Sequence, residues 1–176
     1  MNDPLALFRA LDAELGQAKQ VREIVICGGA ALIALGIVSR ETRDVDVLIP
    51  DLDPFLEEAA HKIAPRFQLK SGWLNNGPRD LTKQLPREWR SNCTEVFRGK
   101  SLKILSIGRA DLIRTKLYAA CDRQEHLPDL IALKPTQREL AEAEEWTLER
   151  DASKVWPQIV SECVAFVKRK LSHDKN

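Results

Sequence analysis

Cysteine, histidine and long apolar runs are scarce in this chain, and each shortage excludes a class of protein. The four cysteines and three histidines include no Cys-x-x-Cys pair and no cluster with metal-ligand spacing, which argues against a disulfide scaffold or a zinc site. The longest uncharged and mostly apolar run, residues 24–38, is too short to cross a bilayer. It also lies too far from the N-terminus, without a basic leader, to be a signal peptide. We therefore expect reduced thiols in a cytoplasmic protein that is not a membrane protein.

The chain has almost no net charge, because its 27 Lys and Arg residues nearly balance its 26 Asp and Glu residues. The charges are nevertheless unevenly spread. Residues 66–109 hold ten basic and three acidic side chains, whereas residues 1–65 hold six basic and eleven acidic ones. An acidic part beside a basic part suits a polyanionic substrate such as a nucleotide or RNA. A solvated basic face explains the same excess equally well.

The hydrophobic pattern of the first part predicts helices alternating with strands. We expect helices over residues 4–18, 30–37 and 55–64, strands over 24–27 and 45–49, and a hairpin of 94–97 and 102–107. Either Asp51 or Asp53 would cap the third helix. Residues 70–92 contain many breakers, which predicts a long loop with short regular pieces, and long loops often carry function.

From residue 110 onward the pattern is helical. It predicts a helix over 111–122, a short helix after Pro128, a helix that begins with the capping box of Thr136 and Glu139, and a last amphipathic helix that frays from Lys168. Together the patterns predict an α+β fold. An α/β core over residues 1–108 would be followed by a helical region over 109–176, packed on the core.

Two aspartates are the best candidates for metal ligands. Asp44 and Asp46 alternate with valines on the strand expected over 45–49, so their side chains share one face. Neighbouring carboxylates repel each other unless a cation lies between them, and Mg²⁺ or Mn²⁺ prefers such carboxylates together with phosphate oxygens. A pair of metal ions held there could stabilise both the attacking and the leaving oxygen of a phosphoryl or nucleotidyl transfer. A solvent-facing strand that happens to alternate aspartate with valine is the other explanation.

Gly28 and Gly29 lie between the strand over 24–27 and the following helix. Glycine lets the backbone approach a phosphate closely and exposes amide donors at a helix N-terminus. A tight turn between strand and helix requires glycine for geometry alone. The spacing matches neither the Walker A nor the GxGxxG pattern.

Four cations complete the candidate site. Arg40 and Arg43 precede the aspartates and could neutralise a triphosphate or pair with neighbouring acids at the surface. Lys116 falls in the apolar stripe of its helix, so it must extend to an edge or reach a polar site. Arg123 lies on the same helix face and could join Lys116 in stabilising a phosphate in the transition state.

The basic segment 66–109 supports a separate hypothesis, RNA binding. In it, Trp73 and Trp89 would act as stacking platforms for bases among the arginines and lysines. A tryptophan in a loop more often anchors a core.

These motifs resemble a known family. Gly28-Gly29, followed by Asp44-x-Asp46 after Arg-x-x-Arg, is similar to the minimal nucleotidyltransferase fold related to DNA polymerase β. More narrowly, the segment 110–120, with Asp122-Arg123 and Leu127-Pro128-Asp129-Leu130, resembles the AbiEii-type toxin nucleotidyltransferases of abortive infection. Trp-Leu-Asn-Asn-Gly-Pro, residues 73–78, is typical of a bacterial branch of that group with no assigned function. The resemblance covers roughly residues 20–150.

The resemblance implies a mixed sheet that carries the metal site, followed by a helical region. It implies Asp44 and Asp46 as ligands of Mg²⁺ or Mn²⁺, Gly28, Gly29 and Ala30 as the phosphate turn for an NTP, Lys116 as a phosphate contact and Asp129 as a site acid. Active members transfer a nucleotide to RNA or protein, and several are toxins neutralised by an antitoxin partner. Without the resemblance, Asp129 needs no function, because a helix dipole favours an acid near its N-terminus.

The chain departs from the family pattern at two places. Ala30 stands where active members have a serine, which removes a hydroxyl donor to the triphosphate. No third carboxylate is obvious; Glu95, on the strand over 94–97, is the best candidate within the sheet. Two hypotheses follow: a metal-dependent nucleotidyltransferase, or a catalytically degenerate relative that binds nucleotide, RNA or a partner protein.

Overall fold

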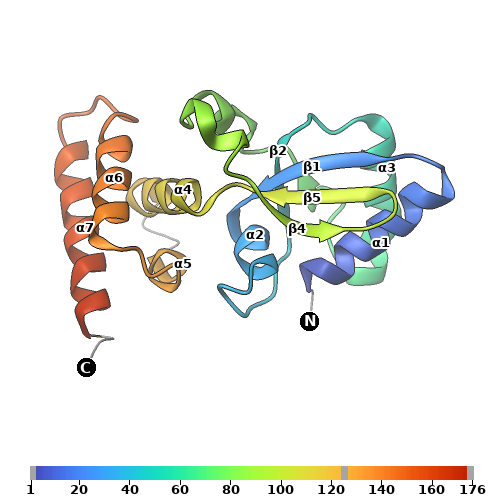
Figure 1. Cartoon of the computed structure of the whole chain (residues 1–176), viewed down its shortest axis with the longest axis horizontal. Coiled ribbons are helices and arrows are strands. Elements are labelled where there is room, and N and C mark those ends of the chain that lie inside the picture. Colours follow the sequence, from blue (N-terminus) through green and yellow to red (C-terminus); the bar gives the residue numbers. More distant parts are fainter. Residues whose placement is uncertain (1–2, 124–126, 174–176) are drawn as a thin grey trace. The chain divides into compact units, whose positions relative to one another are not determined.

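The computed structural model describes residues 3–123 and 127–173 of the chain. The chain divides into two compact units, Met1–Gly108 and Arg109–Asn176, of which the first is built around a β-sheet and the second is helical (Figure 1). The expected α+β class, with a mixed sheet, flanking helices and C-terminal helices, is confirmed.

The sheet of the first unit places the aspartates in a defined setting. Its five strands are β1 (Arg22–Cys27), β2 (Val45–Ile49), β3 (Leu74–Asn75), β4 (Thr94–Arg98) and β5 (Leu102–Ser106), in the order β3-β2-β1-β5-β4. β1 runs antiparallel to β2 and parallel to β5. Across the strands, Cys27 pairs with Asp46, and Asp46 pairs with Asn75. β2 therefore lies between the strand that leads into the glycines and the short β3.

Three α-helices flank this sheet. They are α1 (Pro4–Gln17), α2 (Gly28–Ala34) and α3 (Pro54–Ile63), and α1 packs against both α2 and α3. The amphipathic first helix is confirmed, since its apolar stripe of Leu7, Phe8, Leu11 and Leu15 is buried. Of the two candidate caps for α3, Asp53 is the one used: its carboxylate accepts a hydrogen bond from the Leu56 amide at 2.9 Å.

The segment expected as a long loop contains short regular pieces. They are β3 and the 3₁₀ helices η2 (Arg79–Lys83) and η3 (Arg87–Arg90), and another 3₁₀ helix, η1 (Ala64–Phe67), extends α3. The hypothesis that Trp73 and Trp89 stack on bases is wrong. Both side chains belong to the core, with 1% and 4% of their surface exposed. The Trp73 indole also donates a hydrogen bond to the Ala60 carbonyl at 2.9 Å, which holds the end of α3 against β3.

The second unit consists of four described helices, α4 (Arg109–Arg123), α5 (Leu127–Ala132), α6 (Gln137–Leu148) and α7 (Trp156–His173). The capping box of Thr136 and Glu139 is confirmed, with both reciprocal hydrogen bonds present. The prediction that α7 frays from Lys168 is wrong, because the helix continues to His173. Basic side chains in that last turn stabilise the helix C-terminus.

No helix in the described ranges, 3–123 and 127–173, has the length and apolarity needed to span a membrane.

Candidate functional site

The two aspartates lie at the start of β2. Asp44 immediately precedes the strand and is exposed, and Asp46 is its second residue and partly exposed. Val45 and Val47, which alternate with them, are completely buried. This alternation turns the valines toward the core and leaves the two carboxylates on the opposite face.

Asp46 lies against the glycine turn. Gly28 has a φ of +70°, a conformation that residues with a side chain rarely adopt. A Cβ atom at Gly28 would lie only 2.6 Å from Oδ2 of Asp46, closer than van der Waals contact allows. Glycine is therefore required here twice, once for the backbone conformation and once for the approach of the carboxylate.

Arg40 covers the second glycine of the turn. A Cβ atom at Gly29 would lie 2.7 Å from Nη2 of Arg40, so the guanidinium rests directly on the backbone of the turn. The structure thus brings a carboxylate and a cation to adjacent glycines. α2 has only seven residues, so the close approach to the backbone matters here more than a helix dipole. Ala30 is buried and its methyl group belongs to the core rather than to the surface of the turn.

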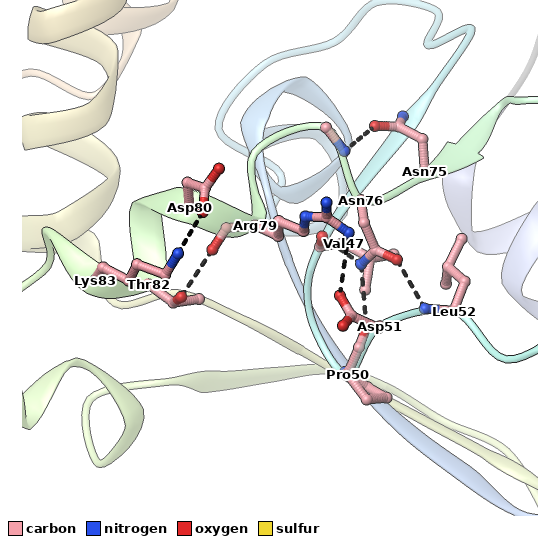
Figure 2. Close-up of polar contacts among 11 residues, drawn as sticks. Val47, Pro50, Asp51, Leu52, Asn75, Asn76, Arg79, Asp80, Thr82 and Lys83 are labelled. Atoms are coloured by element: carbon pink, nitrogen blue, oxygen red, sulfur yellow. Dashed lines mark hydrogen bonds and ion pairs between the residues drawn. The ribbon is translucent and has the colours of Figure 1, made fainter.

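Asn75 holds Asp46 from the other side. Its Nδ2 donates a hydrogen bond of 3.3 Å to Oδ1 of Asp46. Its own Oδ1 accepts one of 2.7 Å from the Gly77 amide, which is drawn in Figure 2. The second bond fixes which end of the Asn75 amide faces the aspartate. The Asp46 carboxylate therefore has Gly28 beside one oxygen and an oriented amide donor on the other.

Asn76 fixes the chain that leaves β2. Its Nδ2 donates to the carbonyls of Val47 and Pro50 at 3.0 and 3.1 Å, and its Oδ1 accepts from the Leu52 amide at 2.7 Å (Figure 2). Sequence reasoning from residue types treated the two asparagines only as breakers of regular structure. The available signal was the match of residues 73–78 to the family segment.

An open cleft of about 870 Å³ begins beside Asp44 on the β3 side of the aspartates. Its wall is formed by the segment before β2, by η1 with the turn that follows it, and by Asn75 of β3. The charged residues in its lining are Glu41, Arg43, Asp44, Arg66 and Lys70, and the remaining ones are Phe67, Gln68, Leu69, Gly72, Trp73 and Asn75.

The two aspartates offer the kind of open, oxygen-lined site that Mg²⁺ prefers. Mg²⁺ binds through one or two carboxylates and completes its octahedron with water and substrate phosphates. The exposed Asp44 and the oriented Asp46 supply such oxygen ligands on one face of β2, and the glycine at position 28 lets the backbone of the turn lie directly beside the Asp46 carboxylate. The residues therefore fit a divalent metal that is shared with a substrate.

Glu95 does not complete this pair. It lies on β4, which β1 and β5 separate from β2, a distance of roughly 14 Å at the usual strand spacing. Its carboxylate is instead bound to the guanidinium of Arg98, which lowers the pKa of Glu95. Within the described residues, no three acidic, histidine or cysteine side chains are grouped to hold a metal.

The remaining candidates lie in the second unit, where two of them bind each other. Nζ of Lys116 and Oδ2 of Asp129 are 2.7 Å apart, and the two side chains are only 6% and 8% exposed. Lys116 thus reaches a polar site, as one of the sequence alternatives required, and its partner there is a carboxylate. Arg123, at the end of α4, is exposed and pairs with Asp122 at 3.4 Å.

Comparison with known proteins gives a family for the chain. A family model described as "Nucleotidyltransferase of unknown function (DUF6036)" matches residues 5–132. The chain belongs to this nucleotidyltransferase family. The matched range contains the glycine turn, both aspartates and the two asparagines, and it reaches through α5 to include Lys116 and Asp129. The searches of curated proteins and of solved structures returned no match.

Proposed function

We propose that this DUF6036 nucleotidyltransferase uses a divalent metal to transfer a nucleoside monophosphate from an NTP to an RNA or protein acceptor. The observation that carries the proposal is the contact between Gly28 and Asp46. It joins a turn that can admit a phosphate to a carboxylate that can hold Mg²⁺, and the strand register fixes the two together. Membership of a family described as nucleotidyltransferase supports the same reaction class.

Each residue of the site has a role in this proposal. Asp44 and Asp46 hold Mg²⁺ or Mn²⁺, which when bound would neutralise charge on the phosphates and on the attacking oxygen. The turn of Gly28 and Gly29 admits the triphosphate close to the backbone, and the guanidinium of Arg40 stabilises its charge. Asn75 keeps the Asp46 carboxylate in one orientation.

The candidate residues of the second unit, Lys116, Asp129 and Arg123, have a smaller part in the proposal. Lys116 and Asp129 were expected to act on the nucleotide, and their mutual ion pair supports a role in stabilising α4 and α5 around a buried charge. Arg123 is exposed and stays a candidate for nucleotide contact.

A transfer assay tests the proposal. Purified protein is mixed with Mg²⁺ or Mn²⁺, each α-labelled NTP in turn, and bacterial RNA and protein, beside the variants Asp46→Asn and Asp80→Asn. Asp80 is an exposed aspartate of the same unit that pairs with Lys83, so its variant controls for the loss of one carboxylate. We expect labelled product with the wild type and the control, and a loss of at least about 10³-fold in Asp46→Asn.

The outcome that counts against the proposal is equally clear. Undiminished labelling by a folded Asp46→Asn protein would remove Asp46 from the metal site. Label that appears on RNA, on a protein or on both also identifies the acceptor class.

A catalytically degenerate nucleotide-binding protein is the second candidate. The specific observations in its favour are the buried Ala30 in the serine position and the remote, Arg98-paired Glu95. This candidate predicts no labelled product in any NTP while Mg²⁺ and NTP still raise the melting temperature, because a ligand that binds only the native state stabilises it.

The resemblance to toxin nucleotidyltransferases extends the proposal to the cell. We expect induced expression in a bacterial cytoplasm to arrest growth and Asp46→Asn to relieve the arrest. An antitoxin would then be a protein that restores growth when it is co-expressed. Growth unaffected by the wild-type protein at an expression level confirmed by blotting would contradict the toxin role.

A further inference from the structure

We propose that the cleft beside Asp44 is a second anion-binding site, which holds the phosphodiester backbone of a nucleic-acid acceptor. The inference rests on the proposed function and deepens it by selecting RNA over protein. It assigns to Arg66 and Lys70 the role of binding the acceptor.

The first argument is the unmatched charge of the cleft. Among the described residues, the side chains of Arg43, Arg66 and Lys70 form no ion pair and no hydrogen bond; Arg66 contacts only the ring of Phe67, 5.4 Å from its centroid. Six other cations of the same unit are paired with acids: Arg22, Lys62, Arg79, Lys83, Arg98 and Lys103. Three cations gathered without partners around a hollow surface favour a ligand that carries several negative charges.

The acids in the cleft do not cancel this charge. Glu41 and Asp44 are the two acidic residues in its lining. Asp44 belongs to the proposed metal pair, where a cation compensates it. Three basic side chains then face Glu41 alone, which leaves an excess of two positive charges for the ligand.

The second argument is the position of the cleft relative to the glycine turn. Gly28 follows β1, the strand on one side of β2, whereas Asn75 and the cleft lie toward β3, on the other side. An in-line transfer places the entering and leaving oxygens on opposite sides of the phosphorus that reacts. With the triphosphate at the glycine turn, the cleft is therefore the side from which the acceptor approaches.

The wall of the cleft is rigidly built. The turn after η1 is closed by hydrogen bonds from the Leu69 amide to the Ala64 carbonyl at 3.0 Å and from the Trp73 amide to the Lys70 carbonyl at 3.1 Å. The buried Trp73 indole then ties this wall to α3. Arg66 and Lys70 are consequently presented from a fixed backbone, which lowers the entropic cost of binding a ligand.

A nucleic acid fits this arrangement better than a protein acceptor. Its backbone offers a regular series of phosphates that several cations can contact together, and such contacts provide most of the affinity of sequence-independent binding. A protein surface presents the same density of negative charge only in an acidic segment. The cleft also holds the amide side chain of Gln68, which can donate hydrogen bonds to phosphate or ribose oxygens.

Binding of a fluorescent single-stranded RNA dodecamer, followed by anisotropy over a range of KCl concentrations, tests the proposal. The cleft variant is Arg66→Ala with Lys70→Ala, and the control variant is Arg9→Ala with Lys100→Ala, which removes one arginine and one lysine from exposed positions outside the cleft. We expect the cleft variant to bind RNA at least about 10-fold more weakly, with a salt slope reduced by about 1.4, because each lost contact to a single strand lowers the slope by about 0.7. The control should change neither quantity.

Two results would overturn the inference. One is an equal loss of RNA affinity in the cleft and control variants. The other comes from competition with a polyglutamate peptide of the same charge as the RNA. If the peptide displaces the labelled RNA at the same concentration as unlabelled RNA does, the site binds acidic protein segments.

The same samples separate this inference from the proposed function. The rise in melting temperature with Mg²⁺ and NTP should be unchanged in the cleft variant, because the nucleotide binds on the opposite side of β2. If the wild type shows no such rise while RNA binding still depends on Arg66 and Lys70, the nucleotidyl-transfer proposal fails and the anion site stands. If the rise is present and RNA affinity is the same in all three proteins, the anion site fails while nucleotide binding at the glycine turn stands, and the transfer assay then decides whether the bound nucleotide is transferred.

Discussion

The carboxylate of Asp46 occupies the space into which any side chain on Gly28 would project. A Cβ atom there would lie 2.6 Å from Oδ2 of the aspartate. The two residues are distant in sequence and meet because Cys27 and Asp46 are partners in the antiparallel ladder of β1 and β2. The glycine turn and the strand that carries the aspartates are thus one structural unit, and a substitution in either alters the other.

The first prediction concerns Gly28→Ala. We expect it to displace the Asp46 carboxylate, to abolish the Mg²⁺-dependent rise in melting temperature with NTP, and to lower transfer at least about 100-fold. Backbone strain at positive φ should also cost about 1–2 kcal/mol of stability. Gly36→Ala is the matched control, because Gly36 has the same φ of +70° but no atom within 4 Å of its Cβ position. Equal loss of nucleotide binding in both variants would assign the effect to strain rather than to Asp46.

The second prediction separates the two asparagines of the β3 loop. Asn75→Ala removes the amide that orients Asp46, so we expect metal affinity or activity to fall about 10- to 100-fold. Asn76→Ala removes three hydrogen bonds to the backbone after β2 and should destabilise the protein by about 1–3 kcal/mol. Mg²⁺ titrations and urea denaturation of both variants distinguish these effects. A lowered melting temperature with normal metal affinity in Asn75→Ala would reduce Asn75 to a structural role.

The third prediction concerns the buried ion pair of the second unit. Lys116→Met leaves the buried carboxylate of Asp129 without its ammonium partner, so we expect a loss of about 3–5 kcal/mol in the free energy of unfolding. Adding Asp129→Asn should recover part of this loss, because the remaining charge is then removed. Arg123→Ala, which breaks an exposed pair, should cost less than about 1 kcal/mol. Urea denaturation measures the free energy of unfolding of all three variants. Equal losses in Lys116→Met and Arg123→Ala would contradict the argument that burial makes the first pair more important.

The fourth prediction is a pH dependence centred on Glu139. The hydrogen bond from Arg109, together with those at the Thr136 cap, lowers the pKa of Glu139 to about 2 from its ordinary value of 4.5. The folded state therefore binds the proton less readily than the unfolded state does. The stabilisation is complete above pH 4.5 and is lost as the pH falls toward about 2.

Glu139→Gln should consequently lower the melting temperature at neutral pH, and the difference from the wild type should shrink between about pH 5 and pH 2. Glutamine can still accept the hydrogen bond from the Thr136 amide, so the difference reports the ion pair with Arg109. Glu145→Gln, at an exposed position of the same helix, serves as the control. A difference that is constant over this pH range would exclude the ion pair with Arg109 as its cause.

Local patterns were enough to predict much of the fold. The alternation of valine and aspartate gave the bounds of β2 as the structure has them, and the box of Thr136 and Glu139 located the start of α6. Both signals lie within a few consecutive residues, so no distant contact is needed to interpret them. β3 has only two residues and shows no periodicity of its own, so its existence follows only from its pairing with β2.

For the candidate site too, some features follow from the sequence and others only from the tertiary structure. The sequence by itself determined which residue types could do the chemistry: a glycine pair, two aspartates on one strand face and the cations around them. Tertiary structure decided which of them meet. Strand register brought Gly28 and Asn75 to Asp46, and it left Glu95 two intervening strands away.

Which polar and aromatic side chains are buried was also decided only by the tertiary structure. It turned Trp73 and Trp89 into core residues, joined Lys116 to Asp129, and left Arg66 and Lys70 beside a cleft. The physical reason is that periodicity reports which face of an element is apolar, whereas the partner of a charge or an indole depends on elements that are distant in sequence and meet only when the chain has folded.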